Sequence, residues 1–208
     1  MVDPQQPEES LIALAGILVA EQSLEKTLSQ VLDLACAALC GDDGGVTLLD
    51  REGPRTAVAT SETARRVDGF QYEADGGGPC LDAYRRQQVL RIDSTSEDQR
   101  WPEFAMAAAT AGIMSTLSLP LVIAGDGLGA VNIYCHEEHG FSEADDALAM
   151  TFASYASVAL ANARVYWRTQ RLADQLEQAL STRGMIEQVE RARERAAAGG
   201  PDRDRGRR

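Results

Sequence analysis

The sequence GIMSTLSLPLVIAGDGLGAVNIY, residues 112–134, decides the fold class. Two runs rich in aliphatic and β-branched residues, 113–123 and 128–136, flank the turn sequence AGDG. Such runs on either side of a short glycine-containing turn predict an antiparallel β-hairpin. Pro120 lies inside the first run and has no backbone N–H to donate, so we expect a bulge or an edge-facing position there.

On the N-terminal side of this hairpin, the pattern begins as helical and then changes to strands. Residues 10–20 are apolar with helical spacing, and residues 23–40 predict a clearer amphipathic helix with Ser23 as its N-cap. The runs 45–50 and 56–61 predict a second hairpin. The rest of this region divides into a stretch without sustained periodicity, a helix with Pro79 in its first turn, a strand and a short helix: residues 62–78, 78–88, 89–94 and 100–112.

On the C-terminal side, a long helix is predicted from Glu143, because no proline or strong breaker follows until Gly184. Ser142 and Asp145 form a variant of the capping box at its start. Residues 147–160 are expected to cover the sheet. Beyond them, a heptad pattern predicts a coiled-coil seam with a second copy of the chain, and therefore a homodimer. The seam residues are Val158, Val165, Leu172, Leu176, Ala179 and Ile186.

The net charge of −12 is unevenly distributed. Residues 1–162 contain 9 Lys+Arg and 25 Asp+Glu, whereas residues 163–208 contain 11 Arg and 7 Asp+Glu. An acidic body repels nucleic acid and anionic membranes, so only the C-terminal segment suits phosphate contacts. No run approaches the roughly 20 apolar residues that span a bilayer. The acidic start MVDPQQPEES is unlike a secretory signal, so we expect a cytoplasmic protein without membrane contact.

Reactive side chains are few, and we expect no enzymatic activity. Cys80 follows Pro79 at the start of a predicted helix, where free N–H groups would lower the pKa of its thiol and favour a redox role. The alternative is a small buried residue that closes this helix against the sheet. His136 and His139 lie in the loop CHEEH, which we interpret as a solvated polar loop rather than a metal site, because their spacing differs from H-E-x-x-H.

The order helix, helix, hairpin, glycine-rich loop, short helix, strand, helix, long hairpin, long helix resembles the GAF family over residues 10–168. The more specific elements are GGGPCLDAYRRQQVLRIDS at 76–94, the hairpin at 112–134 and HGFSEADDALAMTFASYASVALANA at 139–163. The resemblance implies an α+β fold with a GAF-like antiparallel sheet of about six strands. Helices from both termini would pack on one face, with a ligand pocket on the other, and the long C-terminal coiled-coil helix would follow.

The pocket that this resemblance implies would bind a small molecule. Its expected walls are Phe70, Tyr72, Cys80, Trp101, Phe104 and Met114. Phenylalanine and tryptophan at these positions are equally consistent with core packing. The cofactor stays unidentified and none is expected. The cyclic-nucleotide motif of some GAF domains is missing, Cys80 lacks the histidine that accompanies bilin attachment, and His136 and His139 lie at the wrong end of the last strand for a haem ligand.

A second resemblance lies in RLADQLEQALSTRGMIEQ, residues 171–188, which is similar to the opening of an ANTAR module. The matching residues are Leu176, Ala179, Leu180, Arg183, Ile186 and Gln188. A complete ANTAR module binds tandem RNA hairpins and relieves transcription termination, which implies an RNA contact for Arg183. The family's next residues, A-K-G-I-L, are replaced by VERAR at 189–193. We therefore expect an incomplete module, from a frameshift or a natural truncation.

These features predict the signal-sensing GAF domain of a transcription antitermination regulator with a truncated RNA-binding output. The alternative is a GAF dimer that acts through protein contacts without RNA. A third class, GAF-type methionine sulfoxide reductases, needs several cysteines around the pocket, and Cys36 and Cys40 on a buried helix face argue against it. The predicted segments are a flexible start, the sensor domain, the ANTAR-like helix and a disordered tail: residues 1–9, 10–163, 164–195 and 196–208.

Overall fold

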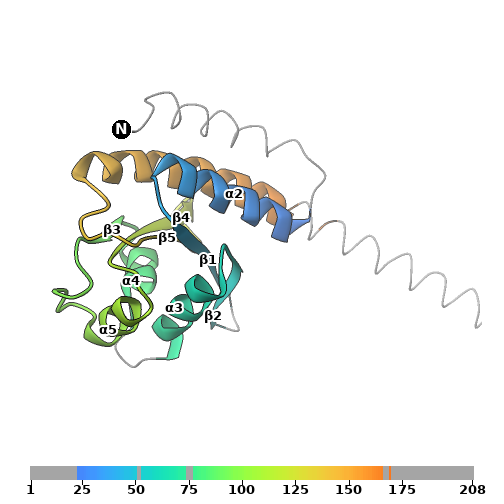
Figure 1. Cartoon of the computed structure of the whole chain (residues 1–208). Coiled ribbons are helices and arrows are strands. Elements are labelled where there is room, and N and C mark those ends of the chain that lie inside the picture. The colour runs from blue at the N-terminus through green and yellow to red at the C-terminus, as the bar shows by residue number, and fades with distance from the viewer. Residues whose placement is uncertain (1–22, 51–52, 74–76, 166–168, 170–208) are drawn as a thin grey trace, which may run out of the picture. The chain divides into compact units, whose positions relative to one another are not determined.

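The computed structural model describes residues 23–50, 53–73, 77–165 and 169. Over these ranges the chain forms a five-stranded antiparallel sheet in the order β2-β1-β5-β4-β3. Figure 1 shows helices on both faces of this sheet. The resemblance implies about six strands, with the helices of both termini on one face. The described residues form five strands, the terminal helices do share one face, and further helices cover the other.

The hairpin predicted from residues 112–134 is confirmed. Strands β4, Ser115–Ile123, and β5, Asp126–Cys135, pair along their whole lengths. The turn between them places Ala124 and Gly125 at positive φ, 50° and 87°, which matches the right-handed twist of the two strands. The pairing shifts by a bulge between Leu121 and Val122, one residue after Pro120.

The second predicted hairpin is also confirmed, as β1, Asp43–Asp50, and β2, Gly53–Ala59. Strand β1 then pairs with β5, so the two hairpins join through their longest strands into one sheet. The short strand β3, Leu90–Ile92, pairs with β4 only as far as Ser118. Pro120 therefore lies beyond the end of β3, where a missing N–H breaks no bond to that strand.

One face of the sheet is covered by α2, Leu24–Ala38, and by the helix at residues 143–165. The side chain of Ser23 accepts a hydrogen bond from the backbone N–H of Lys26 at 3.2 Å, which confirms the predicted N-cap. The capping box is confirmed as well, because the Asp145 carboxylate accepts from the backbone N–H of Ser142 at 2.7 Å. This face buries an apolar core to which the C-terminal helix contributes Phe152 and Leu160.

The other face carries α3, Glu62–Glu73, α4, Pro79–Arg86, and α5, Pro102–Thr110. The pattern predicted α4 and α5, but it indicated no regular structure for most of residues 62–78. Helix α3 was missed because its buried face is only partly apolar. Ala64 and Val67 are buried there together with Asp68 and Gln71, so the apolar residues alone do not repeat at helical spacing.

Part of the predicted coiled-coil seam is described. Val158 and Val165 lie on the outer side of the C-terminal helix, where Val165 is 68% exposed. Leu172, Leu176, Ala179 and Ile186 lie outside the described residues, as do Arg183, residues 1–9, 10–20 and the tail at 196–208. Within the described ranges, no helix combines the length and apolar character needed to cross a bilayer.

The close pairing of β1 and β5 leaves no room for a side chain at Gly129. A Cβ atom there would lie 2.0 Å from the backbone carbonyl oxygen of Thr47, which cannot rotate away. We expect Gly129→Ala to lower the free energy of unfolding by about 1–3 kcal/mol, measured by urea denaturation. The matched control is Gly69→Ala in α3, where no atom lies within 4 Å. There alanine should be neutral or stabilise by up to about 1 kcal/mol, since it favours helix. Equal losses in both variants would contradict this account.

Candidate ligand-sensing site

A cluster of polar side chains is buried between α3 and the sheet. Its centre is the carboxyl group of Asp68, which is fully buried. Helix α3 begins where the hydroxyl of Ser61 accepts from the N–H of Ala64 at 3.1 Å, and helical spacing then places Asp68 and Tyr72 on one face. Gly45 on β1 makes room for this carboxyl, because a Cβ atom there would lie 2.1 Å from Asp68 Oδ2.

Hydrogen bonds tie the Asp68 carboxyl to β5 and β2, and the neighbouring hydroxyl of Tyr72 extends the cluster to β1. Oδ1 accepts from Asn132 Nδ2 at 2.8 Å and from the hydroxyl of Tyr134, both on β5. Oδ2 accepts a longer bond, 3.4 Å, from the hydroxyl of Thr56 on β2. The hydroxyl of Tyr72 is bonded to Thr56 at 2.9 Å and to Thr47 on β1 at 2.6 Å. The cluster therefore joins α3 to β1, β2 and β5.

The electrostatics of the cluster are unusual for a protein core. Burial raises the pKa of Asp68 to about 6, although the hydrogen bonds from Tyr134 and Asn132 oppose the rise. Burial and the neighbouring Asp68 also raise the pKa values of Tyr72 and Tyr134 above their usual range. A buried carboxyl destabilises the folded state when it is charged. A change in its protonation therefore changes the free energy of unfolding.

The structure divides the six residues that we predicted for the pocket. Tyr72 belongs to the polar cluster, whereas Trp101 and Phe104 are buried in an apolar core with α3 and β3. Met114 is half-buried, and Phe70 is 42% exposed on the outer side of α3. The sequence analysis missed the residues at the centre of the cluster, Asp68, Asn132 and Tyr134. The available indication was an asparagine and a tyrosine at alternate positions of a strand that is otherwise aliphatic.

Cys80 is fully buried at the first turn of α4. Its backbone N–H donates to Gln71 Oε1 at 2.8 Å, so the helix N-terminus is already occupied. Burial, followed by the charge of Asp68, raises the pKa of the Cys80 thiol to about 12. This direction is opposite to the one expected from the helix N-terminus, and it disfavours the thiolate that redox chemistry needs. The geometry fits the alternative interpretation, a buried residue that closes α4 against the sheet.

The two histidines lie in an exposed loop after β5. Nδ1 of His136 is 3.6 Å from a carboxylate oxygen of Asp42, and Nε2 is 3.7 Å from one of Asp43. Across the described part of the chain, no group of three or more histidine, cysteine or carboxylate side chains is arranged to hold a metal ion.

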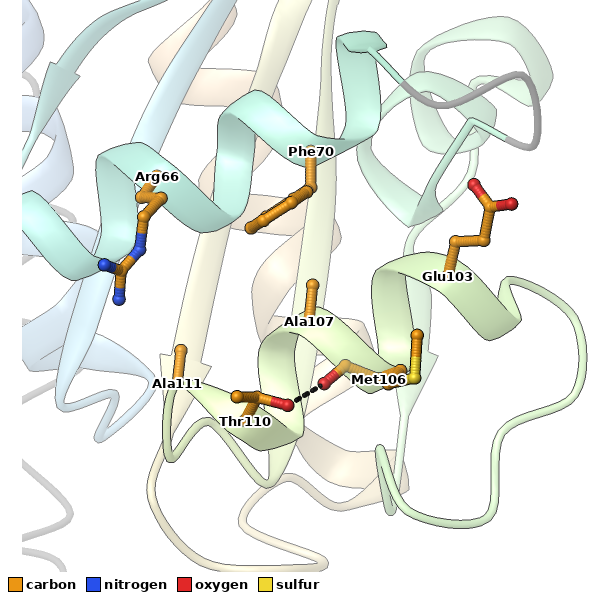
Figure 2. Close-up of a pocket in the computed structure, with 7 residues that line it drawn as sticks. All are labelled: Arg66, Phe70, Glu103, Met106, Ala107, Thr110 and Ala111. Carbon is orange, nitrogen blue, oxygen red and sulfur yellow. Dashed lines mark hydrogen bonds between the residues drawn. The ribbon is translucent and has the colours of Figure 1, made fainter.

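A groove runs along the surface outside the cluster, between α3 and α5, with a volume of about 690 Å³ (Figure 2). Phe70 is the only one of the six predicted pocket residues among those that line it. The described chain thus has two neighbouring features on this side of the sheet, a filled polar cluster beneath α3 and an open apolar groove beside it.

Comparison with known families identifies the fold. A family model described as GAF domain matches residues 21–161. The chain belongs to the GAF domain family. GAF domains are sensor domains typical of signalling proteins. The polar cluster and the adjacent groove are therefore the candidate sensing site of this domain. No curated protein matches the chain.

Solved structures share the GAF fold at low identity. The GAF domain of a phosphoenolpyruvate-protein phosphotransferase from Coxiella burnetii is 20% identical with a TM-score of 0.61, covering 79% of this chain and 98% of that one. A GAF domain/HD domain protein from Geobacter sulfurreducens is 18% identical with a TM-score of 0.56, covering 71% and 98%. The free methionine-R-sulfoxide reductase from Neisseria meningitidis, solved with its substrate, is 14% identical with a TM-score of 0.63, covering 80% and 96%.

The raised pKa of Asp68 makes stability depend on pH. Because the folded-state pKa, about 6, lies above the ordinary value of 3.8, the neutral carboxyl favours folding. This contribution is complete below about pH 4 and is lost as the pH rises through 6. We expect Asp68→Asn, which keeps the shape but cannot ionise, to gain roughly 2–3 kcal/mol relative to the wild type between pH 4 and pH 7, measured by urea denaturation.

The matched control for this measurement is Asp126→Asn, which removes an exposed carboxylate from the first residue of β5. Asp42 also makes stability depend on pH, with the opposite sign, because the hydrogen bond from the backbone of His136 lowers its pKa. Only the difference between each variant and the wild type is therefore informative. Parallel profiles for Asp68→Asn and the wild type would contradict the assignment.

Proposed function

We propose that this GAF domain senses a signal on the α3 side of its sheet and transmits it to the C-terminal helix, within a cytoplasmic regulator that relieves transcription termination. The observation that carries the proposal is the hydrogen-bonded Asp68 cluster. It connects α3 to β1 and β5, and the opposite face of the same strands packs on α2 and the C-terminal helix. A shift of α3 that breaks these bonds changes the strands on which the output helix rests.

The strands provide a short route for this transmission. Along β5, Asn132 and Tyr134 contact Asp68, while their neighbours Val131 and Ile133 belong to the core that contains Phe152 of the C-terminal helix. Alternate residues of β5 thus face α3 on one side of the sheet and the C-terminal helix on the other. A ligand that binds one arrangement of α3 better than another shifts the population of both layers together.

The RNA output is supported by the resemblance of residues 171–188 to an ANTAR opening and by the excess of arginine after residue 163. The departure from the family pattern at 189–193 supports a truncated module that binds RNA weakly. The acidic body would keep nucleic acid away from the sensor domain and direct any contact to this segment.

Dimerisation is the second part of the proposal. Tyr155, Val158 and Val165 expose apolar surface along the outer side of the C-terminal helix, and Val158 and Val165 are seven residues apart. An exposed apolar stripe at heptad spacing is typical of a helix that pairs with another helix. A GAF dimer that acts through protein contacts, without RNA, remains the alternative output.

We propose a sensor rather than an enzyme. The fold is shared with methionine sulfoxide reductases, but at these identities the likeness concerns the fold alone. Burial raises the pKa values of the Cys36 and Cys80 thiols to about 12, which disfavours thiolate chemistry at either residue. Reduction of free methionine sulfoxide by the purified chain would contradict this part of the proposal.

The RNA output can be tested by gel shift with a tandem-hairpin RNA at stated salt concentration. We expect weak binding that exceeds the binding of a single-stranded RNA of the same length and that falls when Arg183 is replaced by Glu. The charge-matched control is Lys26→Glu on α2, which should bind as the wild type does. Equal binding of the two RNAs, or no effect of Arg183→Glu, would leave the protein-contact alternative. Tight and sequence-selective binding would contradict a truncated module.

The seam can be tested by sedimentation of the chain truncated after Ala163. We expect the full chain to dimerise and the truncated chain to dissociate at least tenfold more readily, because about 1.4 kcal/mol or more of apolar contact would be lost with the seam. Dimerisation of equal strength in both would show that the seam is not the interface. The apolar segment at residues 10–20 would then be the next candidate.

A further inference from the structure

The groove between α3 and α5 has an apolar floor. Figure 2 shows Phe70 of α3 facing Ala107 and Met106 of α5, with Ala111 farther along. The alanine side chains end at Cβ, so they leave the space between the two helices open. Phe70 is 42% exposed and Met106 is 68% exposed, although both are large apolar residues. The volume of about 690 Å³ falls within the range typical of ligand sites.

The two ends of the groove carry opposite charges. Arg66 of α3 lies at one end, near Ala111, and Glu103 of α5 lies at the other (Figure 2). Neither side chain forms a salt bridge with another described residue, whereas nearby Arg65 donates to the carbonyl oxygen of Thr56. Thr110 offers no free donor to a ligand, because its hydroxyl donates to the carbonyl oxygen of Met106 at 2.7 Å.

The spacing along α5 sets the length of a matching ligand. Glu103 and Ala111 are eight residues apart, and a rise of 1.5 Å per residue places them about 12 Å apart along the helix axis. An extended chain of three residues spans roughly 10–11 Å between its ends. A tripeptide is therefore about 1–2 Å shorter than this spacing, a gap that the long side chains of Arg66 and Glu103 can cover.

We propose that this groove binds short apolar peptides with free termini. The terminal carboxylate lies at Arg66, the terminal ammonium lies at Glu103, and apolar side chains contact Phe70, Met106 and Ala107. The open side of the groove leaves the peptide amides accessible to water, so they need no hydrogen-bond partners on the apolar floor. This inference names a ligand class for the sensor proposed above. Peptide binding itself does not depend on the sensor proposal. Only the expectation that binding changes dimerisation or RNA binding rests on it.

Binding of trileucine to the full chain, measured by isothermal titration calorimetry, tests the proposal. N-acetylation or C-terminal amidation of the peptide should each weaken binding about threefold, since an exposed ion pair contributes up to about 1 kcal/mol. Arg66→Glu should weaken binding of the unmodified peptide by more than about threefold, and C-terminal amidation should then have little additional effect. Glu103→Lys should also weaken binding, and N-acetylation should then have little additional effect.

The double variant Arg66→Glu/Glu103→Lys provides the decisive comparison, because it reverses the charges without changing the floor. It should bind trileucine more tightly than either single variant does, with the peptide reversed. The control Lys26→Glu lies on α2, on the opposite face of the sheet, and should bind as the wild type does. Met106→Glu, at an exposed position, should abolish binding without unfolding the protein.

The proposal is overturned if trileucine does not bind at millimolar concentration. It is also overturned if the blocked peptides bind as well as the free one. A dimer that Met106→Glu dissociates would identify a second copy of the chain as the occupant instead. Failure of the sensor proposal looks different: trileucine would bind with the predicted charge dependence, yet dimerisation and RNA binding would not change.

Discussion

The rest of the structure depends on the hydrogen bonds that the buried Asp68 carboxyl accepts from β5. This carboxyl is buried under α3 and accepts hydrogen bonds from Asn132 and Tyr134 of the central strand β5. A buried carboxyl without these donors would destabilise the fold by several kcal/mol. The donors in turn lack another described acceptor of comparable strength. Helix α3 is therefore held against the sheet by a polar contact in addition to the small apolar core that includes Ala64 and Val67.

This polar contact separates the domain into two layers of different character. The layer with α2 and the C-terminal helix packs on the sheet mainly through apolar side chains, which gives a close-packed core. The layer with α3 combines a small apolar core with the Asp68 cluster, whose carboxyl has a pKa of about 6. A layer held by a titratable network responds to protons and polar ligands more readily than one held by packing. This asymmetry supports the proposal of a sensor that reports to a terminal helix.

The polar cluster and the groove meet on α3. Asp68 points into the sheet, while Arg66 and Phe70, on either side of it in sequence, line the groove. Because one helix carries both features, an occupant of the proposed site between α3 and α5 would contact the helix that the Asp68 bonds hold in place. The proposed peptide site and the proposed transmission route are thus mechanically adjacent, although they depend on different physical forces.

The sequence by itself determined the elements that are specified by residues close together in the chain. The hairpin β4–β5 follows from its turn, α2 from Ser23 and its apolar stripe, and the start of the C-terminal helix from the Ser142–Asp145 pair. Only the tertiary structure decided α3, because its buried face is half polar and its periodicity appears once Asn132 and Tyr134 lie opposite Asp68. It also decided that Cys80 is a buried, weakly acidic thiol. Burial and neighbouring charge come from residues far apart in the chain, and they outweigh the local effect of a helix N-terminus.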